Sequence, residues 1–170
     1  MSVLEAFAAD GPLAGAIDDF RPRAEQQQMA DAVEQALLQR RTLIVEAGTG
    51  VGKTFAYLLP ALLSGRRVLI STGTRTLQDQ LYGRDLPLLR RVLGSPVKVS
   101  LLKGRSNYLC LYRVDRIELD PRLDPPGLAE DLLAVRRWAG RTRSGDRAGL
   151  DEVPAERPIW SRVTSTVDNC

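Results

Sequence analysis

Apolar residues change their spacing several times along the chain, and each spacing predicts a type of element. An amphipathic helix is expected over residues 23–39, where apolar side chains recur at helical intervals. These apolar positions are Met29, Val33, Ala36 and Leu37. Short apolar runs rich in β-branched residues predict buried strands at residues 42–45, 68–70 and 97–102. Two further helices are expected between these strands, at residues 53–63 and 77–93.

The order of these elements predicts the fold class. Strand, helix, strand, helix and strand at this spacing require right-handed crossovers, and therefore a parallel sheet with flanking helices. We expect an α/β fold whose functional residues lie at the carboxyl ends of the strands. Residues 1–19 are rich in small residues, with glycines and a proline, and are predicted to form a poorly ordered lead-in.

Beyond residue 102 the pattern changes. Helical segments separated by turns rich in Pro, Gly and Asp replace the alternation of strands and helices. These helices are expected near residues 108–116, 128–138 and 157–163. The change predicts either a domain boundary or an insertion.

Composition limits the classes of protein to which the chain can belong. Its 170 residues suffice for one ordinary domain, and 44% apolar with 26% charged residues suits a soluble globular protein. No apolar stretch approaches the ~20 residues of a membrane span, and no secretory signal is evident. We therefore expect a cytoplasmic protein with no membrane partner, whose two cysteines are free or metal-bound.

The ionisable residues limit the catalytic sites, metal sites and partners that the chain can have. The chain has no histidine, which excludes histidine-based zinc sites and Ser–His or Cys–His catalysis within it. Its net charge is +3, and nearly all of its 24 basic residues are arginines. Arginine suits a nucleic-acid partner, although codon usage is the favoured explanation of the arginine content. Only Lys53, Lys98 and Lys103 are lysines.

A glycine-rich turn between the first predicted strand and the next helix is the clearest candidate site. It comprises Ala47, Gly48, Thr49, Gly50, Val51, Gly52, Lys53 and Thr54. This is the context that a Walker A phosphate-binding loop (P-loop) requires, and the glycines let backbone N–H groups face phosphate oxygens. We predict that Lys53 contacts the β- and γ-phosphates of ATP and that Thr54 ligates Mg²⁺. Ala47 replaces the usual first glycine.

The hydrolytic half of such a site is not evident. Hydrolysis needs carboxylates at the end of another strand, to hold magnesium and to position water. The candidates for these carboxylates are Asp151 and Glu152. They follow no apolar strand and are close to Pro154. We interpret the pair as a solvated turn, and expect the chain alone to bind nucleotide without hydrolysing it.

Two segments resemble motifs of superfamily 2 helicases. Residues 23–29 resemble the adenine-recognising Q-motif, which implies that Arg23 and Gln26 lie near the adenine; a polar helix start is the alternative. Residues 71–81 resemble motif Ia, which contacts the backbone of single-stranded DNA, and a turn that only caps a helix is the alternative. The residues implied in DNA contacts are Thr72, Thr74, Arg75 and Gln78.

The segment around the first cysteine is the most distinctive. Residues 102–110 resemble the entry to the iron–sulfur insertion of XPD-like helicases, in particular the DinG/YoaA branch. The resemblance implies that Cys110 and Cys170 are two of the four ligands of a [4Fe–4S] cluster. Two thiolates cannot complete such a cluster, and two idle thiols remain the alternative.

Taken together, the motifs predict three regions. These are a lead-in (1–19), the first part of a RecA-like motor domain (20–104) and a partial, mostly helical iron–sulfur domain (105–170). The resemblance implies the N-terminal part of an ATP-dependent 5′–3′ DNA helicase that acts on single-stranded or forked DNA in repair or damage tolerance. Its expected partners are a missing C-terminal motor domain and replication or repair proteins. Alternatives are a truncated or split-gene product that acts only as a nucleotide- or DNA-binding module, and an unrelated P-loop ATPase.

Overall fold

The computed structural model describes residues 1–119 and 125–167. The chain forms two compact units, Met1–Leu101 and Leu102–Cys170, and each has its own cluster of buried apolar side chains. Cys170 lies outside the described residues, and the assignment of the units to motor and iron–sulfur domains stays a prediction. Among the described helices, none is long and apolar enough to cross a membrane.

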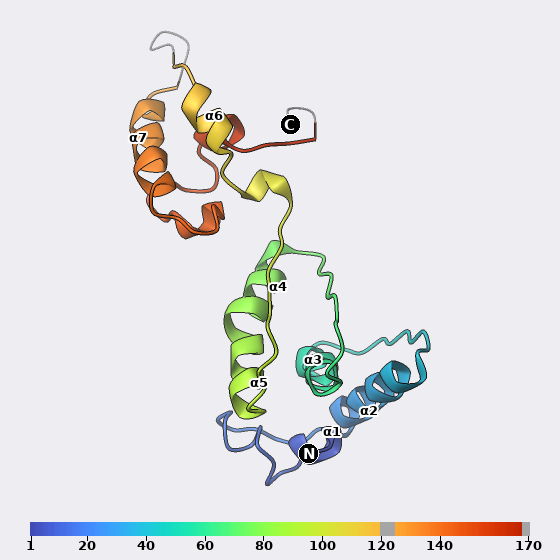
Figure 1. Cartoon of the computed structure of the whole chain (residues 1–170). Coiled ribbons are helices and arrows are strands. Elements are labelled where there is room, and N and C mark those ends of the chain that lie inside the picture. The colour runs from blue at the N-terminus through green and yellow to red at the C-terminus, as the bar shows by residue number, and fades with distance from the viewer. Residues whose placement is uncertain (120–124, 168–170) are drawn as a thin grey trace. The chain divides into compact units, whose positions relative to one another are not determined.

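Helices make up most of the regular structure of the first unit (Figure 1). Their buried apolar side chains form one cluster. The bounds of these helices are Val3–Ala6 (α1), Ala24–Gln39 (α2), Lys53–Leu63 (α3), Arg75–Gln80 (α4), Leu81–Asp85 (η1, a π-helical turn) and Leu86–Val92 (α5). The helices predicted over residues 23–39 and 53–63 are therefore confirmed. α2 packs against α3, and each contributes fully buried side chains to the cluster, among them Ala30 and Leu59.

The helix predicted over residues 77–93 is present, but it is interrupted. α4, η1 and α5 follow one another directly, and the middle turn has the wider π-helical hydrogen bonding. Pro87 lies in the first turn of α5 and has no N–H group to donate to the preceding turn. The π-helical turn is placed directly before this proline, where a regular α-helical bond is missing.

The prediction of a poorly ordered lead-in over residues 1–19 is wrong. Ser2 and Glu5 form a reciprocal capping box, in which each side chain binds the other residue's backbone N–H, and α1 begins there. Phe7 and Leu13 are fully buried in the cluster of the first unit. The short helix and its small residues were mistaken for a loop, because the core that covers them lies far away in the sequence.

The predicted parallel sheet is not formed in this structure. Within residues 1–119 and 125–167 there are only two isolated antiparallel bridges, and the runs at 42–45, 68–70 and 97–102 are not paired. Ile44 is 92% exposed and Leu69 95% exposed, although their sequence pattern predicts burial. A parallel strand obtains its hydrogen bonds and its cover from neighbouring strands and helices, and these runs have neither here.

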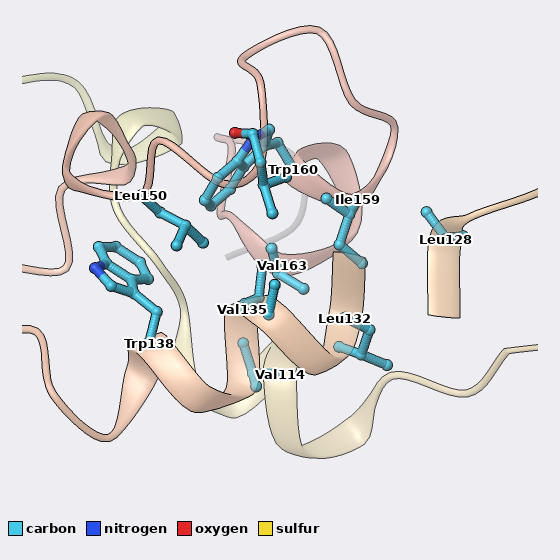
Figure 2. Packing of buried hydrophobic residues seen from close by; sticks show 11 residues of the cluster. Val114, Leu128, Leu132, Val135, Trp138, Leu150, Ile159, Trp160 and Val163 are labelled. Carbon is cyan, nitrogen blue, oxygen red and sulfur yellow. The ribbon is translucent and has the colours of Figure 1, made fainter. Parts of the chain in front are cut away.

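The second unit is small and mostly helical. Its helices are Leu111–Arg116 (α6), Leu128–Ala139 (α7) and Ile159–Val163 (α8), with 3₁₀ turns at Arg105–Asn107 (η2) and Arg147–Gly149 (η3). The three predicted helices are present, although the first and last begin later than expected. Figure 2 shows the core, in which the rings of Trp138 and Trp160 meet edge to face at a centroid distance of 6.3 Å.

Candidate nucleotide-binding site

The predicted P-loop adopts a conformation that only its glycines allow at low cost. Gly50 and Gly52 have φ angles of +81° and +85°, in the left-handed region that other residues rarely enter. Gly52 is the last residue before α3, which begins at Lys53. The loop therefore wraps tightly and leads directly into a helix N-terminus, where free N–H groups and the helix dipole favour an anion.

Lys53 lies across this loop. Its ammonium group donates hydrogen bonds to the carbonyl oxygens of Ala47 at 2.7 Å and of Gly48 at 2.6 Å. These two bonds hold the positive charge beside the turn that the sequence predicted to bind phosphate. Ala47, Gly48 and Lys53, which were predicted to act together, are therefore brought together.

Gln26 reaches the P-loop from the first turn of α2. Its side chain is buried, and Nε2 donates a hydrogen bond to the carbonyl oxygen of Gly52 at 2.9 Å. A Cβ atom on Gly52 would collide with the Gln26 amide, so a larger residue there would displace this side chain in addition to straining the φ angle. Arg23, the other residue of the predicted adenine site, is the exposed residue before α2. Of this pair, only Gln26 contacts the P-loop.

Thr54, the predicted magnesium ligand, is in the first turn of α3, one helical turn before Tyr57. Burial raises the pKa of Tyr57; a hydrogen bond with the Thr54 side chain opposes this, and the negative charge of Asp85 adds to the rise. The phenol therefore stays neutral at physiological pH. The sequence analysis identified Thr54 but missed Tyr57 and Asp85.

The residues predicted to contact DNA cluster at the start of α4. Thr74 caps this helix, because its hydroxyl accepts a hydrogen bond from the Leu77 N–H at 3.2 Å. The Thr72 hydroxyl donates to the carbonyl oxygen of Thr74 at 3.2 Å. Arg75 and Gln78 follow in the first turn of the helix. All four lie together, and the capping role of Thr74, which was the alternative explanation, is present.

In each of two acidic pairs of the second unit, one carboxylate has an arginine partner. Asp151 and Glu152 are exposed in a turn, as interpreted from the sequence, and Glu152 forms an ion pair with Arg137 at 2.8 Å. A second adjacent pair, Glu130 and Asp131, lies on α7, where Asp131 accepts a hydrogen bond from Arg157. Neither pair follows a strand in the described residues.

Cys110 precedes α6 and lies beside a segment that is distant in sequence. Its backbone N–H donates to the carbonyl oxygen of Val163 at 2.8 Å, and its neighbour Leu109 forms a bridge with Thr164. A hydrogen bond from Ser165 lowers the pKa of the Cys110 thiol; burial opposes this, and the N–H groups of α6 and the charge of Arg113 add to it. Ser165 was missed by the sequence analysis. No group of three or more His, Cys, Asp or Glu residues in the described ranges could hold a metal ion.

Comparison with known proteins identifies the family. The family model for the DEAD/DEAH box helicase matches residues 24–118, which include the P-loop and the predicted DNA-contact turn, and the chain belongs to this family. It is 49% identical over 164 residues to the ATP-dependent DNA helicase YoaA of Escherichia coli, and 46% identical to the YoaA of Haemophilus influenzae. It is also 38% identical to the ATP-dependent helicase DinG of Mycobacterium tuberculosis.

These relatives are much longer than this chain. The alignments cover 96% of the chain and 26% of each YoaA protein, and 87% of the chain and 25% of the DinG protein. The chain therefore spans about a quarter of the length of the relatives that it matches.

Proposed function

We propose that this chain is the nucleotide-binding part of an ATP-dependent DNA helicase of the DinG/YoaA type. The observation that carries the proposal is the P-loop, in which two glycines adopt left-handed angles and Lys53 lies across the turn. The similarity to proteins named as ATP-dependent DNA helicases supports it. The whole protein would couple ATP hydrolysis to 5′–3′ movement on single-stranded or forked DNA in DNA repair or damage tolerance. Cytoplasmic localisation and protein partners stay predictions.

The P-loop residues have distinct roles in this proposal. Lys53 now donates to two loop carbonyls, and phosphate oxygens are stronger acceptors because they carry charge, so the β- and γ-phosphates of ATP would take these bonds over. The backbone N–H groups of the loop would bind the remaining phosphate oxygens. Thr54 would supply a hydroxyl ligand for magnesium, and Gln26, which contacts the loop, would support its adenine side.

We also propose that the three unpaired apolar runs are strands of a RecA-like parallel sheet. Side chains such as Ile44 and Leu69 are almost fully exposed here, and burying an aliphatic side chain of this size stabilises a protein by about 1.5–3 kcal/mol. About three quarters of each YoaA relative lies outside the region that this chain matches, and in the whole protein such sequence would supply the partner strands and the hydrolytic carboxylates.

For the second unit we propose the opening part of an iron–sulfur domain. The thiolate is the form that ligates iron, and the surroundings of Cys110 favour the thiolate. Because Cys110 pairs with the chain at Val163, the segment that continues to Cys170 starts beside it. One described cysteine does not make up the four thiolates of a [4Fe–4S] cluster, so the other ligands would come from Cys170 and from the rest of the protein.

The nucleotide site can be tested directly in this chain. Titration calorimetry with ADP and Mg²⁺ should show binding to the wild type and a loss of roughly tenfold or more in Lys53→Ala, since a charge-assisted phosphate contact is worth about 1.5–3 kcal/mol. Lys98→Ala is the matched control, because Lys98 is an exposed lysine of the same unit outside the loop. If the wild type and Lys53→Ala bind equally, or if neither binds, the nucleotide site is refuted.

A further inference from the structure

Arginines are concentrated where α7, orange in Figure 1, ends and continues into a turn. Residues 132–145 contain four arginines and no acidic residue, whereas the whole chain has 24 basic and 21 acidic residues. The four are Arg136, Arg137, Arg141 and Arg143, and all are exposed. Codon usage can explain why the basic residues are arginines and not lysines. It does not explain why acidic residues are missing from this segment.

Three of the four arginines have no acidic partner within the described residues. Arg137 forms the exposed ion pair with Glu152 at 2.8 Å. Arg136 donates a hydrogen bond to a backbone carbonyl oxygen of α6 at 3.4 Å, which leaves its positive charge uncompensated. The guanidinium groups of Arg141 and Arg143 form no hydrogen bond or ion pair in the part of the chain that the structure describes. These two groups are therefore available to an anionic ligand.

Hydrogen bonds hold the backbone of the turn that carries these two groups. The N–H groups of Arg141 and Thr142 both donate to the carbonyl oxygen of Trp138 at 2.9 Å. The Thr142 hydroxyl accepts a hydrogen bond from the Gly145 N–H at 3.0 Å, and Gly145 has a φ angle of +69°, which glycine adopts at low cost. Arg143 lies between these anchors. Because its backbone is already held, binding a ligand there would order little more than a side chain.

Asp146, the acidic residue that follows the turn, does not neutralise it. Its Oδ2 atom is 2.8 Å from Lys103 Nζ, and both side chains are largely buried. Its Oδ1 atom accepts a hydrogen bond from a backbone N–H of η3 at 3.1 Å. The Leu109 N–H also donates to the Gly145 carbonyl oxygen at 2.8 Å. The turn is therefore fixed to the second unit, while the charges of its arginines stay unpaired.

We propose that the turn at residues 140–145 binds the phosphate backbone of single-stranded DNA through Arg141 and Arg143. A guanidinium group presents a planar fork of N–H donors that matches phosphate oxygens, and the absence of nearby carboxylates favours an anion. Trp138 is buried, so the segment offers no exposed aromatic ring on which a base could stack. Contact with phosphates alone predicts binding that is independent of base sequence.

This inference rests on the proposed function and adds a DNA contact to it. The turn lies outside residues 24–118, which match the helicase family model, and outside the predicted DNA-contact turn before α4. The choice of DNA as the ligand follows from the similarity to proteins named as DNA helicases. The turn itself supplies the charge and the geometry for a phosphate chain.

The experiment measures the affinity of the whole chain for a fluorescein-labelled oligothymidylate by fluorescence anisotropy, over a series of salt concentrations. Each phosphate that a protein neutralises on a single strand contributes about −0.7 to the slope of log K against log salt concentration. In Arg141→Gln/Arg143→Gln two such contacts are lost, so the slope should become shallower by about 1.4. Arg141→Lys/Arg143→Lys keeps both charges and should keep the slope of the wild type.

Arg41→Gln/Arg67→Gln is the matched control, because it removes the same charge from two exposed arginines of the first unit. It should leave the slope unchanged. Equal shifts in the two glutamine variants would show that only net charge matters, and would overturn the inference. An unchanged slope in Arg141→Gln/Arg143→Gln would also overturn it, as would a wild-type chain that does not bind the oligonucleotide.

Two further measurements separate this inference from folding and from the nucleotide site. The fluorescence of the buried Trp138 and Trp160 should be the same in Arg141→Gln/Arg143→Gln and in the wild type, since both substituted side chains are exposed. The same variant should bind ADP as tightly as the wild type does. If the ADP affinity behaves as proposed for Lys53→Ala while the salt slope does not change in Arg141→Gln/Arg143→Gln, the DNA contact fails and the nucleotide site stands.

Discussion

The side-chain amide of Gln26 donates a hydrogen bond to the carbonyl oxygen of Gly52 at 2.9 Å. This bond joins the first turn of α2 to Gly52, the P-loop residue just before α3, 26 positions further along the chain. The amide is buried, and the Gly52 carbonyl also accepts the N–H of Ala56 inside α3. Gln26 thus ties the loop to a second helix as well as to its own.

We predict that Gln26→Ala destabilises the first unit. The substitution removes a buried hydrogen bond and leaves a small cavity beside the loop, which should lower the free energy of unfolding by about 1–3 kcal/mol. Gln28→Ala is the control, because Gln28 is an exposed residue of the same helix and should change stability little. Urea unfolding followed by circular dichroism measures both, and equal midpoints for the two variants would contradict the prediction.

Gly52→Ala should lower the free energy of unfolding more than an alanine substitution at a glycine whose φ angle is not strained. At Gly52 the φ angle of +85° strains any side chain, and the new Cβ would collide with the Gln26 amide. We expect a loss of about 1–3 kcal/mol in the free energy of unfolding. The double variant Gln26→Ala/Gly52→Ala should lose less free energy of unfolding than the two single variants lose together, because the collision partner is removed.

The control for Gly52→Ala is Gly73→Ala, in the turn before α4. Gly73 has open space around it and no strained φ angle, so alanine should be tolerated. If Gly52→Ala and Gly73→Ala unfold at the same urea concentration, neither the strain nor the collision at Gly52 matters for stability.

In the second unit, Lys103→Ala should be strongly destabilising. Lys103 Nζ and Asp146 Oδ2 are 2.8 Å apart, and the two side chains are only 4% and 17% exposed. Removing the lysine leaves a largely buried carboxylate without its charged partner, which should cost up to about 3 kcal/mol. Arg137→Ala is the matched control, since its ion pair with Glu152 is exposed and worth about 0–1 kcal/mol.

Tryptophan fluorescence can measure the difference in stability between Lys103→Ala and Arg137→Ala in the second unit alone. The two tryptophans of the chain, Trp138 and Trp160, both lie in the core of the second unit. Their unfolding transition should therefore shift in Lys103→Ala and hardly move in Arg137→Ala. Similar shifts in the two variants would show that the buried ion pair contributes no more than the exposed one.

The Cys110 thiol should react with iodoacetamide at lower pH than an ordinary cysteine. The reactive form is the thiolate, and because the folded chain lowers the pKa of Cys110, the thiolate fraction at a given pH is larger in the folded than in the urea-unfolded chain. Ser165→Ala removes the largest cause of the lowered pKa, so the pH midpoint of alkylation should rise. Mass spectrometry of the peptide containing Cys110 distinguishes it from Cys170; an unchanged midpoint in Ser165→Ala would contradict the assignment of Ser165.

Local sequence patterns determined most helices and the P-loop of this protein. α2, α3 and α7 were predicted within a few residues, because helical hydrogen bonds join residues four apart and leave a periodic apolar face. The P-loop could be found because its glycines occupy alternate positions directly before Lys53 and Thr54, and because phosphate binding needs them at that spacing.

Only the tertiary structure decided which distant residues meet. The contacts of Gln26 with Gly52 and of Cys110 with Val163 join segments whose approach no local pattern encodes. The burial of α1 likewise depends on the core around it. The strand pattern at residues 42–45, 68–70 and 97–102 is also local, but a strand forms only when another segment supplies its hydrogen bonds. The sequence alone therefore determined where strands can form, and the tertiary structure determined that these runs stay unpaired within the described residues.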